Sequence, residues 1–126
     1  MRQLDVGLLV LTSLEKAVLD LMLDRPGELY CTLREHLAHA SVSRREFTGV
    51  GFATYFTVPS YAPVRRDLSE TAIYDVGADI RGLTNGASFV LFIRDGVLSF
   101  LEGVTTTGDW PEDTDDFRVY RFQAAS

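Results

Sequence analysis

Glu102 is the acidic residue whose surroundings in the sequence are best suited to chemistry. It directly follows the apolar run of residues 97–101. A carboxyl group among apolar side chains has a raised pKa and can serve as a general acid or base. The alternative is a carboxylate at a strand end that pairs with an arginine or caps a turn. Asp75 and Asp79 lie four residues apart on another expected strand, where a solvated sheet face is a simpler interpretation than a catalytic pair.

Both histidines and the only cysteine fall in one expected helix. His36 and His39 have the i, i+3 spacing of two metal ligands, but no third ligand and no HExxH pattern accompany them. We predict ordinary histidines on the helix surface. Cys31 and Glu35 share a helix face that His36 does not, so we expect an inert, partly buried thiol. Since spacing brings no nucleophile, base and orienting group together, we assign no catalytic residue, metal or cofactor.

Trp110 marks the best candidate for a binding surface. Tryptophan is enriched where proteins bind one another, and an acidic rim would attract a basic partner. The alternative is a tryptophan that closes the edge of the core while its acidic neighbours stay in water. The acids near it are Asp109, Glu112, Asp113, Asp115 and Asp116. With Phe92 and Glu102 of the central hairpin, the expected binding residues are Trp110, Asp109, Glu112 and Asp113.

The element that positions Phe92 and Glu102 is an expected hairpin with two apolar strands, residues 87–94 and 97–103. Asp95 and Gly96 between them are a strong signal for a two-residue turn. The pairs expected from such a turn are Arg94 with Val97, Phe92 with Ser99, and Phe89 with Glu102.

This register leaves apolar side chains on both faces of the hairpin, whereas a half-exposed strand pair alternates apolar and polar residues. The second face therefore needs a curl of the sheet, the segment 4–11 or a second subunit. Because exposed apolar patches usually mark interfaces, we predict a homodimer through a sheet face. One face is expected to carry Phe89, Leu91, Ile93, Leu98, Phe100 and Glu102, and the other Val90, Phe92, Arg94, Val97, Ser99 and Leu101.

Two helices precede the strands. Thr12 and Glu15 form a capping box, and apolar residues then recur with helical spacing from Leu14 to Met22. A second helix is expected over residues 28–40, and from residue 41 the period changes to two. These patterns predict an α+β fold with two N-terminal helices packed on a curved, mainly antiparallel sheet of about five to six strands.

The length of 126 residues predicts a single domain that can bury a core without disulfides or metal. The net charge of −6 comes mainly from the five acids near Trp110, so we expect no broad nucleic-acid surface. No membrane span is expected, and one cysteine fits a cytoplasmic protein. The expected organisation is a lead-in strand or extension (1–11), a helical pair (12–40), an antiparallel sheet (41–122) and a frayed tail (123–126).

Three segments carry a resemblance: SRREFTGVGF (43–52), LFIRDGVLSFLEG (91–103) and DWPE (109–112). With the helical start they resemble a family of small uncharacterised bacterial proteins, over about residues 12–112. The resemblance implies a bacterial, single-domain, intracellular protein. It implies no activity and no site residues.

Three functions are therefore considered. A non-enzymatic protein-interaction module of the inhibitor, immunity or accessory type is preferred, because of the acidic segment around Trp110 and the lack of a catalytic constellation. The alternatives are an enzyme that uses Glu102 as acid or base and a small-molecule-binding domain with an aromatic pocket in the curved sheet. The aromatic residues expected to line such a pocket are Phe52, Tyr55, Phe56, Phe89, Phe92 and Phe100.

Overall fold

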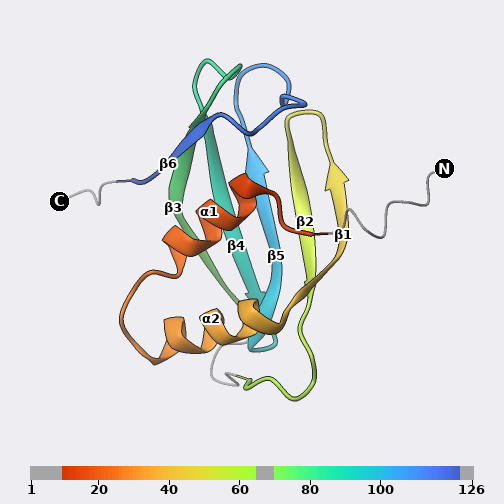
Figure 1. Ribbon diagram of the computed structural model, residues 1–126, viewed down its shortest axis with the longest axis vertical. Coiled ribbons are helices and arrows are strands. Elements are labelled where there is room, and N and C mark those ends of the chain that lie inside the picture. Colours follow the sequence, from red (N-terminus) through yellow and green to blue (C-terminus); the bar gives the residue numbers. More distant parts are fainter. Residues whose placement is uncertain (1–9, 65–69, 123–126) are drawn as a thin grey trace.

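The computed structural model describes residues 10–64 and 70–122, in which two helices lie across one face of a sheet (Figure 1). The predicted α+β fold with N-terminal helices and a curved antiparallel sheet is confirmed. The expected tail and most of the expected lead-in segment lie outside the described residues. The elements are α1 (Ser13–Met22), α2 (Glu28–His39), β1 (Ser41–Phe47), β2 (Gly51–Thr57), β3 (Glu70–Ile80), β4 (Ala87–Arg94), β5 (Val97–Val104) and β6 (Phe117–Arg121).

Within the described residues, the sheet has six antiparallel strands in the order β1-β2-β5-β4-β3-β6. The expected hairpin, β4 with β5, lies at its centre, and β1 and β6 form its edges. The β1 edge contains a bulge between Val42 and Arg44, followed by charged residues. A bulge and charges on an edge strand discourage pairing with other strands, so the faces of the sheet are better candidates for contacts than this edge.

The helix α1 begins at the predicted capping box. The Thr12 side chain accepts a hydrogen bond from the Glu15 backbone N–H at 3.1 Å, and the Glu15 carboxylate accepts one from the Thr12 N–H at 2.8 Å. These bonds satisfy two donors that a helix start leaves unpaired. The helix therefore starts at a fixed place and turns Leu14, Val18 and Met22 toward the sheet, where all three are buried.

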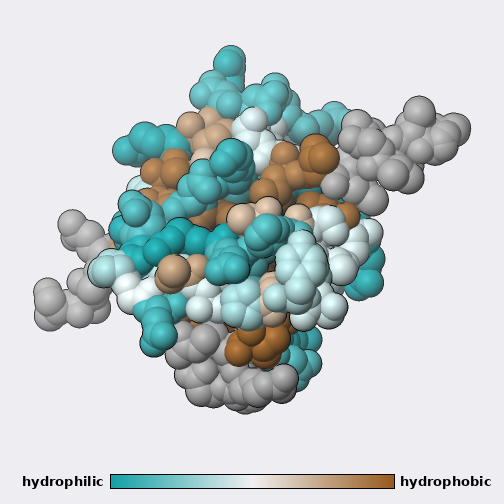
Figure 2. Space-filling model, turned by 60° about the horizontal axis from the view of Figure 1, so that its bottom comes forward, coloured by the Kyte–Doolittle hydropathy of each residue, from teal (hydrophilic) through white to brown (hydrophobic). Residues whose placement is uncertain are grey.

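The core lies between the helices and the sheet. Phe89, Leu91 and Ile93 of β4 are completely buried there, as is Leu101 of β5. Burial of each such side chain contributes about 2 kcal/mol to folding. Figure 2 turns the lower end of the molecule toward the viewer and shows hydrophobic residues in separate clusters among hydrophilic ones. The helices thus complete one hydrophobic layer, and the other face of the sheet, called here the open face, is covered by neither α1 nor α2 (Figure 1).

The register of the central hairpin differs from the prediction beyond its first pair. Asp95 (φ 54°) and Gly96 (φ 80°) form the tight turn, and Arg94 pairs with Val97. Ser99 is then an extra residue on β5, which makes a bulge between successive pairs. The observed pairs are Ile93 with Leu98, Phe92 with Phe100, Val90 with Glu102, and Phe89 with Gly103.

The bulge exchanges the faces of the residues that follow it, because neighbouring residues of a strand point to opposite sides. Leu101 lies in the core, and Phe100 and Glu102 lie on the open face. The predicted faces were therefore wrong for these three residues. Glu102 is exposed and lies opposite Val90, and Leu98 lies in the core, so only Phe100 and Glu102 of the predicted line share a face.

Two further predictions, both for residues of α2, were wrong. His36 is completely buried, whereas the sequence predicted a surface position. Its Nε2 contacts the Pro63 carbonyl oxygen, because the loop after β2 folds over this side of the helix. His39 is exposed, as expected, and its ring meets Tyr61 edge-on at a centroid distance of 5.7 Å. Cys31 is exposed rather than partly buried, since it lies off the helix face that Leu33 and His36 bury.

Candidate functional site

Trp110 lies half-buried at the edge of the core, beside the turn between β1 and β2. Its backbone N–H donates to the Gly49 carbonyl oxygen at 2.8 Å, which fixes the loop after β5 against that turn. The indole ring packs edge-on against Phe52 and Phe89, at centroid distances of 5.2 and 6.4 Å. Trp110 therefore closes one edge of the core, as one interpretation of the sequence expected, and still keeps part of its ring in contact with solvent.

A hollow of about 370 Å³ opens beside this ring. A smaller hollow of about 110 Å³ adjoins it and reaches inward to Glu15 and Arg45. Phe47 at the end of β1 is 69% exposed, which is unusual for so large an apolar side chain and leaves the wall of the hollow open to a ligand. We call the two hollows together the Trp110 groove, and the residues that line both of them are Phe47, Trp110, Pro111 and Glu112.

The outer rim of the groove is acidic. Glu112 lines the groove. Asp109 and Asp113 directly precede and follow the lining segment 110–112 in the sequence, and all three acids are exposed. Among the five acids of this segment, Asp116 alone has an ion pair within the described residues, with Arg81 at 3.6 Å. The expected acidic residues are thus brought beside an apolar hollow, where they create a negative potential for an approaching ligand.

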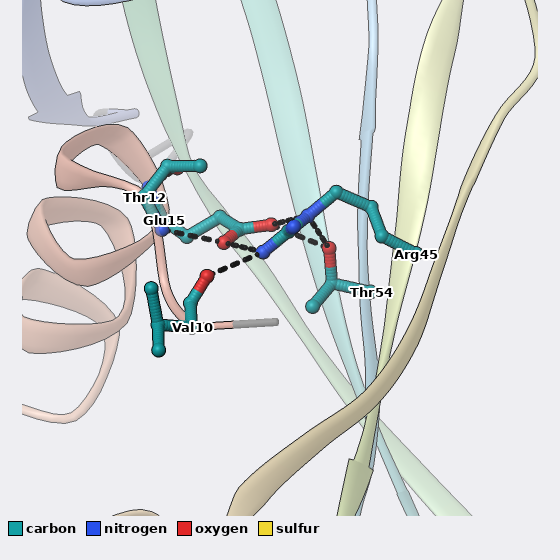
Figure 3. Close-up of polar contacts among 5 residues, drawn as sticks. All are labelled: Val10, Thr12, Glu15, Arg45 and Thr54. Carbon is teal, nitrogen blue, oxygen red and sulfur yellow. Dashed lines mark hydrogen bonds and ion pairs between the residues drawn. The ribbon is translucent and has the colours of Figure 1, made fainter. Parts of the chain in front are cut away.

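The inner end of the groove holds a buried ion pair that the sequence analysis missed (Figure 3). Glu15 is 2% exposed, and Arg45 donates to both of its carboxylate oxygens, at 2.7 and 2.9 Å. The Thr54 hydroxyl also donates to Glu15, and Arg45 donates to the Val10 carbonyl oxygen at 2.8 Å. The charges compensate each other and their hydrogen bonds are made, so this cluster joins α1 to β1 and β2 and leaves no reactive group.

A signal for this pair exists in the sequence. Glu15 lies on the same helical stripe as Val18, Leu19 and Met22, so a helix that buries those residues must also bury the carboxylate. The capping box by itself explains a glutamate at position 15, so the sequence prediction did not include its burial. The identity of the arginine that compensates it depends on a contact across 30 residues of chain.

The open face carries the other two expected binding residues, Phe92 and Glu102. Cross-strand pairing aligns two neighbouring rows of side chains on this face. We call the first the aromatic row and the second the acidic row. The aromatic row consists of Arg44, Tyr55, Phe100 and Phe92, and the acidic row of Glu46, Ala53, Glu102 and Val90.

The rings of the aromatic row stack against each other along the row. Phe92 and Phe100 stack at a centroid distance of 4.4 Å, and Phe100 and Tyr55 at 5.1 Å. The Arg44 guanidinium covers the outer face of Tyr55 at 3.9 Å, and the Arg94 guanidinium lies 5.2 Å from the centre of Phe100. Because neighbours occupy the ring faces, the row cannot offer those faces to nucleic-acid bases in the way that single-strand binding sheets do.

Trp110 and the aromatic row lie on opposite sides of the sheet, since Trp110 packs on the core residues Phe52 and Phe89. The expected binding residues therefore divide into two separate surfaces. The same division affects the aromatic pocket expected for a small molecule, because Phe52 and Phe89 belong to the core while Tyr55 and Phe100 belong to the open face. These residues do not line a common pocket.

The structure brings together no set of residues suited to catalysis in the part of the chain it describes. Asp79 pairs with Arg118 at 2.7 Å, and Asp75 pairs with Arg25, so each of the two carboxylates has a cationic partner of its own. No group of three or more His, Cys, Asp or Glu side chains within these residues could hold a metal ion. None of the described helices has the length and apolar character needed to cross a membrane.

Comparisons with protein-family models, with curated proteins and with solved structures find no match for this chain. The resemblance of its three segments to a family of small bacterial proteins therefore stays a prediction from the sequence. The candidate function has to be argued from the two surfaces themselves.

Proposed function

We propose that the chain is a non-enzymatic protein-interaction module, of the inhibitor, immunity or accessory type, that binds a basic segment of another protein in the Trp110 groove. One observation carries this proposal: an apolar hollow with an exposed aromatic wall lies beside carboxylates that have no ion pair within the described residues. Apolar contacts would supply affinity, and the acidic rim would select a cationic partner and attract it over distance.

The chemistry of the groove fits an arginine or lysine next to an apolar residue. A cation can lie over the face of Trp110 or Phe47, where the ring quadrupole attracts it, and can pair with the Glu112 carboxylate. The indole N–H of Trp110 has no acceptor within the described residues and can donate to a carbonyl group of the bound segment. A groove with an apolar wall, an acceptor and a donor therefore suits an extended peptide.

A small-molecule-binding domain is the second candidate, because a hollow of about 370 Å³ is large enough for a small ligand. The acidic rim would again favour a cationic one. No specific observation favours the enzyme alternative, since Glu102 is exposed rather than enclosed by apolar side chains.

Trp110 is the only tryptophan of the chain, so its fluorescence reports directly on the groove. We would titrate the protein with short peptides that place an arginine or lysine beside an apolar residue, and with matched peptides that carry glutamate instead. The basic peptides should change the emission of Trp110 in a saturable way. Binding of the acidic peptides with equal affinity, or no response to any basic peptide, would contradict the proposal.

Variants then locate the binding. Glu112→Gln and Phe47→Ala should each weaken peptide binding by about tenfold, since each removes one of the contacts on which the site depends. Glu35→Gln, which neutralises an exposed acid on α2, should leave the affinity unchanged. Replacement of all five acids of the segment by their amides should abolish binding, and unchanged binding would remove this segment from the proposal. A response to small cations but to no peptide would favour the second candidate.

The homodimer expected from the sequence is the second part of the proposal. Its support is the position of Phe92, Phe100 and Tyr55 on the face that no helix covers (Figure 1). A cytoplasmic, bacterial setting completes the proposal, and the single cysteine of the chain and the resemblance of its segments support that setting.

A further inference from the structure

We infer that two copies of the chain associate face to face about a two-fold axis that runs between the aromatic row and the acidic row, parallel to both. This inference rests on the homodimer part of the proposed function and is independent of the Trp110 groove. Its basis is the self-complementary pattern of the open face, in which each bulky or basic side chain has a small or acidic one at the matching position of the next row.

The two rows lie side by side along the strands. Residues two positions apart on a strand point to the same face and are about 7 Å apart. Tyr55 and Ala53 occupy these positions on β2, Phe100 and Glu102 on β5, and Phe92 and Val90 on β4. A half-turn rotation about an axis midway between the rows places the aromatic row of one copy over the acidic row of the other.

This rotation matches size. It places the Tyr55 ring of each copy over Ala53 of the second copy, and Phe92 over Val90. Large side chains thus meet small ones, which allows two sheets to pack closely. The rings stand on the open face with their edges outward, because their faces are stacked on one another. The outward edges of the rings form ridges, and these ridges can fit beside the smaller side chains in the acidic row of the second copy.

The same rotation matches charge. The Arg94 guanidinium lies near the Phe100 ring, 5.2 Å from its centre, and Phe100 is the residue that comes to face Glu102 of the second copy. At the outer end of the rows, Arg44 and Glu46 form an ion pair within one chain at 3.3 Å, and the rotation places each of them over the opposite charge of the second copy. Each dimer therefore contains two copies of both ion pairs, as an isologous interface requires.

The charge pattern also argues for a second copy rather than a different protein. The open face carries two arginines, Arg44 of the aromatic row and Arg94 next to Phe100, and the acidic row carries two glutamates, Glu46 and Glu102. A partner that is uniformly acidic or basic would leave one pair of charges facing a like charge. A copy of the same face places a charge of opposite sign near each of the four, which distinguishes this surface from the uniformly acidic rim of the Trp110 groove.

The test uses charge reversal at two exposed positions. Arg94→Glu and Glu102→Arg each place like charges opposite one another in the proposed dimer, so each variant alone should dimerise at least about tenfold more weakly than the parent chain. In an equimolar mixture of the two variants, every contact again joins opposite charges. The mixture should therefore form a heterodimer, which light scattering on a sizing column and native mass spectrometry would detect.

The matched control is Glu35→Arg, a charge reversal on the exposed side of α2 that should leave the dimer intact. Circular dichroism of each variant checks that the fold is retained. A monomeric parent chain would overturn the inference, as would a mixture that remains monomeric. Neither result bears on the groove, because the Trp110 titration with basic peptides can be repeated on the same variants and should give unchanged affinities.

Discussion

Glu15 and Arg45 illustrate how much depends on single residues in this fold. Their ion pair is 2% and 12% exposed on its two sides, and it connects the start of α1 to the second half of β1. Removal of water from two charges is costly, and the attraction between them offsets this cost only when both partners are present. The pair therefore places strict demands on both positions.

We expect Arg45→Met to lower the free energy of unfolding by about 3 kcal/mol or more, because it leaves the Glu15 carboxylate buried without a cation. The double variant Glu15→Gln, Arg45→Met should recover part of this loss. Urea unfolding, followed by circular dichroism, measures both changes. If the losses of unfolding free energy caused by Glu15→Gln and by Arg45→Met simply add in the double variant, the pair does not act as a unit.

Two single residues show why the environments of candidate catalytic groups were difficult to predict from the sequence. Glu102 is exposed, which agrees with the alternative of a solvated strand end, whereas His36 is buried although a surface position was predicted. The turn before Glu102 was predicted correctly, but the register was not, so the expected pairing of Glu102 with Phe89 was wrong. Burial of His36 depends on its contact with Pro63 in the loop after β2, and the periodicity of α2 does not predict this contact.

The bulge at Ser99 is the decisive feature at the scale of elements. One additional residue on β5 turns Leu101 toward the helices and turns Phe100 and Glu102 toward the open face. Without it, a phenylalanine and a glutamate would point into the core while a leucine would point into water. The apolar character of both faces of the hairpin concealed this choice, because either register places many apolar side chains inside.

Deletion of Ser99 should therefore prevent folding or reduce stability severely, since a one-residue shift moves Glu102 toward the hydrophobic layer. Ser99→Ala, which keeps the residue count, should change the free energy of unfolding by less than about 1 kcal/mol. Thermal unfolding of the two variants makes the comparison. A deletion variant of nearly parent stability would mean that the register of β5 can slip without harm.

The whole molecule is a two-layer structure whose two proposed contact surfaces lie on opposite sides of the sheet. Helices α1 and α2 cover one side (Figure 1). The Trp110 groove opens at the margin of that layer, where it reaches Thr12 and Leu14 at the start of α1. The aromatic row lies on the other side. A dimer formed through the open faces would direct its two grooves outward, so each copy could bind a partner while the dimer stays together.

The net charge of −6 is concentrated near the groove, which gives the two surfaces different responses to salt. Attraction between the acidic rim and a basic peptide is screened as ionic strength rises, because the Debye length falls to roughly 3 Å at 1 M. We expect peptide affinity to fall severalfold between low and high salt, whereas the partly apolar dimer should weaken less. Titrations of Trp110 fluorescence and sedimentation at several salt concentrations would measure this; peptide binding that is indifferent to salt would contradict it.

The sequence by itself determined the local structure: the capping box at Thr12, the apolar stripe of α1, the tight turn at Asp95 and Gly96, and the change from helical to strand periodicity at residue 41. These features arise from interactions among residues close in the chain, so a short stretch is sufficient to specify them.

Only the tertiary structure decided which side of each strand faces the helices, which arginine compensates Glu15, and what Trp110 packs against. The contacts responsible join residues 30 or more positions apart, such as Arg45 with Glu15 and Trp110 with Phe52. They exist because folding brings distant segments to one place where all their volumes and charges must be satisfied together, a condition that no short stretch of sequence contains.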